Sequence, residues 1–145
     1  MDFSLTEDQQ LMVDGFTELM NSEAWEKYFH ECDENSEYPE RWVKAICDLG
    51  FDRILLPEEY DGLGLGWQTL AAAYEALGRA GGPTYVLYQL PGWDTVIREG
   101  TEEQKKDILK FVGSGKQMLN YAMTEPSAGS SWDDMSTTYT RKGGK

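Results

Sequence analysis

Short amphipathic segments fill the sequence from residue 4 to residue 112, and glycine or proline separates one segment from the next. Within each segment, apolar residues recur every three or four positions, which is the spacing of one face of an α-helix. Two stretches, Ser4–Glu7 and Thr101–Gln104, have the pattern of a capping box, in which a hydroxyl and a longer polar side chain satisfy amides at the start of a helix. Together these signals predict an all-helical domain over residues 1–115.

The ends of the second and third expected helices are marked by residues that favour such positions. Ser22 is placed to cap the second helix, Pro39 suits the first turn of the third, and Gly50 suits its carboxyl end. His30 lies off the apolar face of the second helix and is expected at the surface. The predicted buried faces of these two helices consist of Trp25, Tyr28, Phe29, Cys32, Trp42, Val43, Ile46 and Leu49.

A glycine-rich stretch follows, with Gly62, Gly64 and Gly66 at alternate positions. Such a pattern suggests a phosphate-binding loop, but it lacks the lysine of a P-loop and the spacing of a dinucleotide fingerprint. A connecting loop is therefore the preferred interpretation. The helix expected next, over residues 67–80, has a buried stripe made of Leu70, Tyr74 and Leu77.

Residues 84–99 are predicted to form another helix, broken at Pro91-Gly92 because proline has no amide hydrogen. Residues 85–90, before the break, are apolar on nearly all sides. This pattern predicts either a buried central helix or the wall of a pocket.

The segment from Tyr121 to Ser131 differs from the helical part of the chain. Residues 118–123 resemble a short strand, which Glu125-Pro126 ends because proline pushes the preceding residue out of helical geometry. The small residues that follow offer backbone amides and hydroxyl groups with little side-chain bulk. Such a loop lets the backbone approach a flat ring or a phosphate closely, and consecutive amides bind anions. A plain turn at the end of a strand is the alternative.

The net charge is −13, from 26 acidic and 13 basic residues. Nucleic acid is therefore not an expected partner, because phosphates are neutralised by clustered lysine and arginine. Cys32 and Cys47 form no CxxC pair and His30 is the one histidine, so no metal site is expected and both cysteines are predicted to be reduced core residues. Without a signal peptide or a run of about 20 apolar residues, a cytoplasmic protein with no membrane span is expected.

The carboxyl-terminal residues suggest a hairpin that is not completed. Residues 136–141 are rich in strand-forming side chains, and residues 142–145 resemble a turn that no return strand follows. Residues 116–145 are therefore predicted to begin a β-domain that is truncated at Lys145. An edge strand with a flexible tail is the alternative.

Three motifs resemble the acyl-CoA dehydrogenases and occur in the order of that family. Ala122–Ser130, A-M-T-E-P-S-A-G-S, closely resembles the flavin-binding signature (A/C)-(L/M/V)-T-E-P-x-A-G-S-D, with Ser131 in place of the final aspartate. Leu56–Gly64, L-P-E-E-Y-D-G-L-G, and Gly100–Lys105, G-T-E-E-Q-K, are similar to two segments of the family's amino-terminal domain. The resemblance covers essentially the whole chain.

This resemblance implies an all-α amino-terminal domain followed by the first strands of a truncated β-barrel middle domain. It also implies that flavin adenine dinucleotide (FAD) is the cofactor. The implied flavin-ring contacts are Tyr121, Met123 and Thr124, and the implied diphosphate contacts are Gly129 and Ser130, of which Ser130 also touches the thioester substrate. The family's catalytic glutamate belongs to its last domain, so the base is expected beyond residue 145 and these residues alone are expected to be inactive. Glu125 belongs to the signature and is expected to have a local structural role.

By the same resemblance, the full-length protein would interconvert an acyl-CoA and its 2,3-enoyl-CoA as a homotetramer, with an electron-transfer flavoprotein as partner. The segment Pro83–Gly92, P-T-Y-V-L-Y-Q-L-P-G, looks like the crotonobetainyl-CoA reductases of bacterial carnitine metabolism, which implies crotonobetainyl-CoA and γ-butyrobetainyl-CoA as the reacting pair. Aromatic faces attract quaternary ammonium groups, so Tyr85 and Tyr88 are candidate substrate contacts, with core packing as the alternative for each. An ordinary short-chain acyl-CoA dehydrogenase and a non-catalytic helical interaction module, suggested by Ser131, are the alternative functions.

Overall fold

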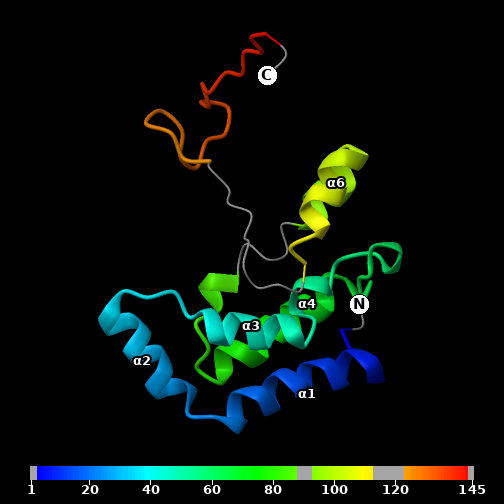
Figure 1. The fold of residues 1–145 in the computed structure, drawn as a ribbon, viewed down its shortest axis with the longest axis vertical. Helices are drawn as coiled ribbons and strands as arrows, with labels where there is room; N and C mark the ends of the chain where they lie inside the picture. The colour runs from blue at the N-terminus through cyan, green and yellow to red at the C-terminus, as the bar shows by residue number, and fades with distance from the viewer. Residues whose placement is uncertain (1–2, 88–92, 113–122, 144–145) are drawn as a thin grey trace.

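The computed structural model describes residues 3–87, 93–112 and 123–143, and the first two ranges contain all of the helices in Figure 1. The elements, with η for a 3-10 helix, are α1 (Glu7–Ser22), α2 (Trp25–Asn35), α3 (Glu40–Asp48), η1 (Phe51–Arg53), η2 (Glu58–Tyr60), α4 (Gly66–Arg79), η3 (Thr84–Leu87), α5 (Trp93–Glu99) and α6 (Glu102–Leu109). The predicted helical class is confirmed. Within these ranges, no helix has both the length and the apolar character needed to cross a membrane.

Helix α1 begins two residues later than the sequence pattern predicted. Thr6, and not Ser4, is the N-cap: its hydroxyl accepts a hydrogen bond from the Gln9 amide at 3.3 Å, and the Gln9 side chain accepts one from the Thr6 amide at 2.9 Å. Both stretches fit the capping-box pattern, but the start at Thr6 leaves Glu7 and a second acidic residue in the first turn, where the helix dipole favours negative charge. The capping box predicted at Thr101–Gln104 is confirmed at the start of α6.

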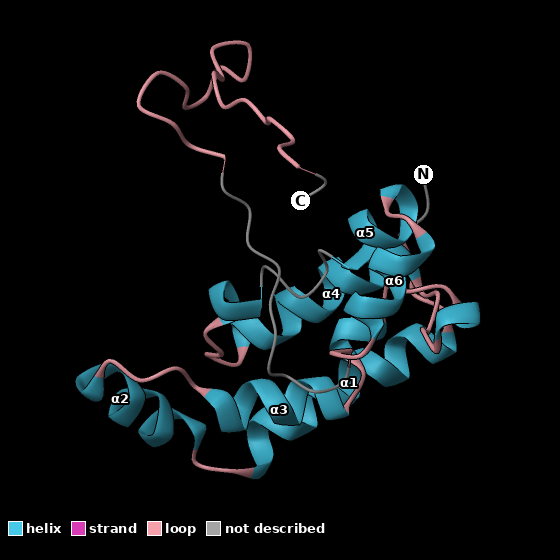
Figure 2. Cartoon of the chain, turned by 45° about the horizontal axis from the view of Figure 1, so that its top comes forward, coloured by secondary structure: helices cyan, strands magenta, loops and turns pink. Residues whose placement is uncertain are grey.

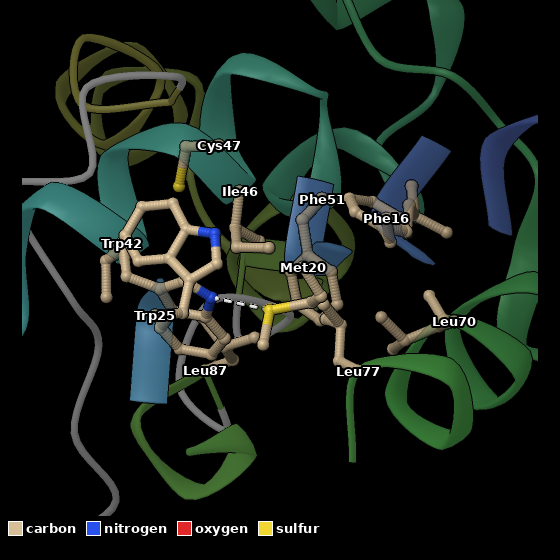
Figure 3. Close-up of a cluster of buried hydrophobic side chains, with 13 residues drawn as sticks. Phe16, Met20, Trp25, Trp42, Ile46, Cys47, Phe51, Leu70, Leu77 and Leu87 are labelled. Carbon is tan, nitrogen blue, oxygen red and sulfur yellow. Dashed lines mark hydrogen bonds between the residues drawn. The ribbon is translucent and has the colours of Figure 1, made fainter. Parts of the chain in front are cut away.

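Helices α1 and α4 pack along each other, and their facing side chains form the centre of the hydrophobic core. Phe16 meets Phe51 edge-on with ring centroids 5.7 Å apart, and Phe51 meets Tyr74 in the same way at 5.1 Å. The Trp42 indole donates a hydrogen bond to the sulfur of Met20 at 3.2 Å, drawn as the dashed line in Figure 3. The buried members of this core are Phe16, Met20, Trp25, Trp42, Val43, Ile46, Cys47, Phe51, Ile54, Leu70, Ala73, Leu77 and Leu87.

Arg41 ties the start of α3 to the start of α2. Its guanidinium carbon lies 4.7 Å from the ring centroid of Trp25 and 4.5 Å from that of Tyr28. The same guanidinium forms an ion pair with Glu23 at 3.2 Å. Stacking of arginine on two aromatic rings holds this corner of the helical body in place although all the charged groups remain at the surface.

Two predictions about helix ends are wrong and one is confirmed. Ser22 does not cap α2, since its hydroxyl donates to the Leu19 carbonyl at 2.8 Å and α2 begins after Ala24 without a side-chain cap. Leu49, predicted to be buried, is 42% exposed because it follows the last residue of α3 and lies off the buried face of that helix. Gly50 has a φ of 87°, the left-handed conformation expected of a glycine that ends a helix.

Both cysteines are buried, as predicted, and they form no disulfide within the described residues. Cys32 is on the inner face of α2, and Cys47 is in the central core. His30 is exposed on α2, as predicted, and lies 3.4 Å from Glu34 one turn later.

The connection between η1 and α4 folds back along the chain that precedes it. The amide of Leu63 donates to the Arg53 carbonyl and that of Gly64 to the Leu56 carbonyl, each at 2.9 Å. Gly62 lies so close to this carbonyl that a Cβ atom on it would be 2.0 Å from the Leu56 oxygen. The glycine-rich stretch is therefore a tight connecting loop, which confirms the preferred interpretation, and glycine is required where the two backbones meet.

Residues 84–87 form the short 3-10 helix η3 in place of the expected α-helix, and the predicted break at Pro91-Gly92 lies outside the described residues. Leu87 is fully buried, but Tyr85 is 78% exposed, so the predicted burial on all sides is wrong for Tyr85. A short 3-10 helix packed against α4 on one side presents its other side to solvent. Helices α5 and α6 then pack against each other, and Ile97 of α5 forms a small second core with Leu56.

Residues 123–143 form a loop that lies apart from the helices, drawn in pink at the top of Figure 2. The described part of the chain contains no strand, and its one isolated β-bridge joins Glu125 and Ala128. Residues 136–141, predicted as a strand, have no strand partner there, and a strand is stable only in a sheet. The strand predicted at residues 118–123 lies outside the described residues except for Met123. The domain boundary at residue 115 therefore stays a prediction.

Candidate functional site

The candidate site is the surface of the loop at residues 123–130. Met123 is 37% exposed, and Thr124, Gly129 and Ser130 are exposed as well. Ala128, between them, is 2% exposed and turns into the loop. Four of the five predicted cofactor contacts therefore lie on one short, accessible piece of backbone.

Residues 125–128 form a tight turn that is closed by backbone hydrogen bonds in both directions. The Glu125 amide donates to the Ala128 carbonyl at 2.9 Å, and the Ala128 amide donates to the Glu125 carbonyl at 3.1 Å. The Ser127 hydroxyl donates to the carbonyl of Asp134 at 3.2 Å, which links the turn to the return of the loop. Pro126 suits this position because it has no amide hydrogen that would need an acceptor.

The Glu125 carboxylate closes the larger loop. One oxygen, Oε2, accepts hydrogen bonds from the Ser136 amide at 2.8 Å and the Ser136 hydroxyl at 3.0 Å, and the other, Oε1, accepts one from the Thr137 amide at 3.1 Å. Hydrogen bonds from Thr137 and Ser136 stabilise the ionised carboxylate and lower the pKa of Glu125 to about 2. The expectation of a local structural role for Glu125 is thereby supported by geometry.

Several backbone amides on either side of the turn have no hydrogen-bond acceptor in the described chain. Within the part of the chain that the structure describes, no acceptor receives the amide hydrogens of Met123, Thr124, Gly129 or Ser130. A Cβ atom on Gly129 would meet nothing within 4 Å, so the space beside it is open. Free amides and hydroxyls beside open space suit a diphosphate or the carbonyl and nitrogen acceptors of a flavin ring, so the residues present fit the implied cofactor.

The remaining predicted site residues have different outcomes. Tyr121 and Tyr88 lie outside the described residues. Tyr85 belongs to η3 in the helical body, and its exposure overturns the core-packing alternative. Tyr85 and the loop at residues 123–130 belong to different parts of the chain, and no contact between them is observed among the described residues. A substrate contact by Tyr85 therefore stays a prediction.

Sequence reasoning missed the partners of Glu125. Ser136 and Thr137 lie 11 and 12 residues further along the chain, beyond any local turn or capping pattern. The sequence shows only that Ser136 and Thr137 follow Glu125 along the chain. No known pattern relates an acidic residue to hydroxyl residues at this distance. Among the described residues, no three of the types His, Cys, Asp and Glu are grouped so that they could hold a metal ion.

Among the hollows of the described helical body, two lie where helices meet. One, of about 440 Å³, lies between α5 and α6 and is lined mainly by apolar atoms, with Val96 and Ile108 among its residues. The other, of about 790 Å³, lies where the end of α1, the start of α2 and the end of α4 meet, beside Trp25 and Arg79. Neither contains a predicted site residue.

The fold and the loop thus define a helical domain that leads into a segment suited to a flavin. Residues 6–116 match the family described as acyl-CoA dehydrogenase, N-terminal domain. This match covers most of the chain, and the chain belongs to that family.

A solved structure is similar to nearly the whole chain. It was described for the electron transferring flavoprotein of Acidaminococcus fermentans, in work on a mechanism of flavin-based electron bifurcation, and it is similar over 99% of this chain with 32% sequence identity and a TM-score of 0.79. The chain spans 38% of the length of that protein. Residues 6–116 therefore form an acyl-CoA dehydrogenase N-terminal domain, and the similar solved structure is that of a flavoprotein.

Proposed function

We propose that the chain forms the amino-terminal part of an FAD-dependent oxidoreductase that interconverts an acyl-CoA and its 2,3-enoyl-CoA in the cytoplasm. The observation that carries this proposal is the segment at residues 123–130, where four amides without acceptors in the described chain stand beside small side chains. Membership of residues 6–116 in the acyl-CoA dehydrogenase family supports it.

In this proposal the chain's residues bind and orient the cofactor. Tyr121, Met123 and Thr124 lie along the flavin ring, and the amides of Gly129 and Ser130 donate to the diphosphate, with Ser130 also touching the thioester. When bound, the flavin takes up or returns the hydride that is exchanged with the β-carbon of the acyl group. Donors along the ring stabilise the negative charge that reduction places on it. Glu125 is not the catalytic base, because both of its oxygens already accept hydrogen bonds within the loop.

For the substrate, we propose crotonobetainyl-CoA and γ-butyrobetainyl-CoA. The exposed ring of Tyr85 is available to a quaternary ammonium, which aromatic faces attract. Burial, together with the charges of Cys47, Glu40 and Tyr85, raises the pKa of Tyr38 to about 12. An electron-transfer flavoprotein is the proposed electron partner, and a homotetramer is the proposed assembly of the full-length protein.

Flavin binding can be tested by NMR on the ¹⁵N-labelled 145-residue chain. Riboflavin is expected to shift the amide signals of Met123 and Thr124, ADP those of Gly129 and Ser130, and FAD all four. Ser130→Asp is expected to weaken the response to ADP and FAD and to leave that to riboflavin unchanged, because a carboxylate repels the diphosphate. Ser22→Asp, with the same change of charge on α1, is the matched control. Absence of a shift at all four positions at millimolar FAD would refute flavin binding by this loop.

The substrate can be tested on the full-length protein that contains this chain. The protein is expected to reduce crotonobetainyl-CoA faster than crotonyl-CoA. In Tyr85→Leu, the ratio of these two rates is expected to be smaller. An equal or greater rate with the substrate that lacks the quaternary ammonium would favour an ordinary short-chain acyl-CoA dehydrogenase. A full-length protein that binds no flavin would favour the non-catalytic helical module.

A further inference from the structure

We propose that Glu125 is a positioning residue for the flavin: its carboxylate closes the loop between residues 125 and 137. It thereby fixes the backbone of Met123, Thr124, Gly129 and Ser130, whose amides have no acceptor among the described residues. This inference rests on the proposed function. It assigns to Glu125 a role in cofactor binding that involves no contact with the cofactor.

The geometry of the carboxylate carries this proposal. Glu125 is the one side chain in the described loop that joins the outgoing backbone to the returning backbone with both of its oxygens, through Ser136 on Oε2 and Thr137 on Oε1. The turn formed by its own backbone with Ala128 fixes the near end of the same segment. The main chain of Glu125 therefore closes the turn at residues 125–128, and its side chain ties that turn to residues 136 and 137.

The loop has few other means of keeping its shape. Ala128 is its only buried residue among those described between 123 and 143, so apolar packing contributes little. The link from Ser127 to the Asp134 carbonyl is a single neutral hydrogen bond at 3.2 Å, whereas those to Glu125 are made to a charged acceptor. Hydrogen bonds to a charged group are the stronger kind, so the loop is expected to open when the carboxylate is lost.

The arrangement requires a carboxylate and not merely a side chain of this size. Glutamine is isosteric with glutamate but has one acceptor oxygen, and its NH₂ group would face one of the donors at Ser136 or Thr137. Aspartate keeps two acceptor oxygens on a side chain that is one methylene shorter. If Glu125 only filled space, Glu125→Gln would keep the loop closed as well as the native chain does, and the shorter Glu125→Asp would keep it closed less well. If two acceptor oxygens are required, Glu125→Asp keeps the loop closed better than Glu125→Gln.

The test uses the 145-residue chain with four variants: Glu125→Gln, Glu125→Asp, Ser136→Ala and Glu18→Gln. Glu18 is exposed on α1 and has no described partner, so Glu18→Gln controls for the change of charge. Amide hydrogen exchange of Ser136 and Thr137 reports the loop, FAD titration followed by NMR at the four free amides reports binding, and far-UV circular dichroism reports the helical body.

Glu125→Gln is expected to speed exchange at Ser136 and Thr137 about tenfold, because hydrogen bonds to a charged acceptor are lost. If the closed loop is the binding-competent form, the apparent Kd for FAD rises by the factor by which the closed fraction of the loop falls. Glu125→Asp is expected to recover part of both effects, and Ser136→Ala, which keeps both amide bonds, to have a smaller effect. The circular dichroism of all variants is expected to match the native chain.

Three results would overturn the proposal. Unchanged amide exchange in Glu125→Gln would show that the carboxylate does not hold the loop. An unchanged Kd for FAD in a variant whose Ser136 and Thr137 amides exchange as fast as unprotected amides would show that the loop is held for a reason other than the flavin, while the proposed function would stand. No binding of FAD by the native chain would refute the proposed function and with it the positioning role.

Discussion

Addition of a single methyl group is expected to have opposite effects at two glycines of this chain. At Gly62, a Cβ atom would lie 2.0 Å from the carbonyl oxygen of Leu56 and 2.3 Å from its carbonyl carbon. Both are backbone atoms that no rotamer change can move, and the same oxygen accepts the Gly64 amide at 2.9 Å. At Gly15, in the middle of α1, a Cβ atom would meet nothing within 4 Å.

The size of each effect follows from these contacts. Gly62→Ala combines steric strain with displacement of a hydrogen bond, so it is expected to lower the free energy of unfolding by about 3 kcal/mol. Gly15→Ala is expected to raise it by roughly 0.5 to 1 kcal/mol, because alanine has the higher helix propensity and restricts the unfolded chain. Since both changes add the same atoms, the difference between the two variants reflects the surroundings of each glycine: backbone contact at Gly62, and helix propensity with open space at Gly15.

Urea denaturation followed by far-UV circular dichroism at 222 nm would measure both free energies on the 145-residue chain. The slope of the free energy against urea concentration should be the same for all three proteins, because the surface exposed on unfolding hardly changes. The reasoning would be refuted by a Gly62→Ala variant within about 0.5 kcal/mol of the native chain, the range usual for surface substitutions. Equal destabilisation by Gly15→Ala would refute it as well.

Three further predictions follow from other contacts. Phe16→Ala should lower the free energy of unfolding by about 3 to 5 kcal/mol in the same assay, because Phe16 is fully buried against Phe51. Thr101→Ala should destabilise the start of α6 by about 1 kcal/mol, seen as faster exchange of the Gln104 amide, because the cap of that amide is lost. The pKa of Glu125, lowered to about 2 from an ordinary value of 4.5, should be seen in a ¹³C NMR titration of its carboxyl; its stabilisation of the loop is then fully present above pH 4.5 and is lost as the pH falls through about 2.

Local signals predicted the helical region well where a residue has a single strong preference. Gly50 ends α3 in the left-handed conformation, Thr101 caps α6, and Leu77 lies in the buried stripe of α4. The errors occurred where two local solutions compete. Ser4 and Thr6 both start a capping box, and the choice between them depends on where the first turn of α1 meets the rest of the body, as in the hydrogen bond from Gln9 to the Leu65 carbonyl at 3.2 Å.

Burial depends on tertiary packing that periodicity does not contain. Leu49 and Tyr85 each continue an apolar pattern, but one follows the end of its helix and the other is on the outer side of η3. In the candidate site, the position of the turn and the exposure of Thr124 and Gly129 agree with the sequence pattern, whereas the bonds from Glu125 to residues 11 and 12 positions away depend on the path of the whole loop. No pattern in the sequence specifies that path.

The burial of both native thiols offers a practical route to the candidate site. Cys32 and Cys47 are 7% and 2% exposed, so neither is accessible to a bulky maleimide in the folded chain. A cysteine introduced at the exposed position of Ser130 would then be the preferred point of attachment, without removal of the native residues. A fluorophore placed there would sit beside the open space at Gly129 and would report any molecule that enters it, whatever the chemical nature of that molecule.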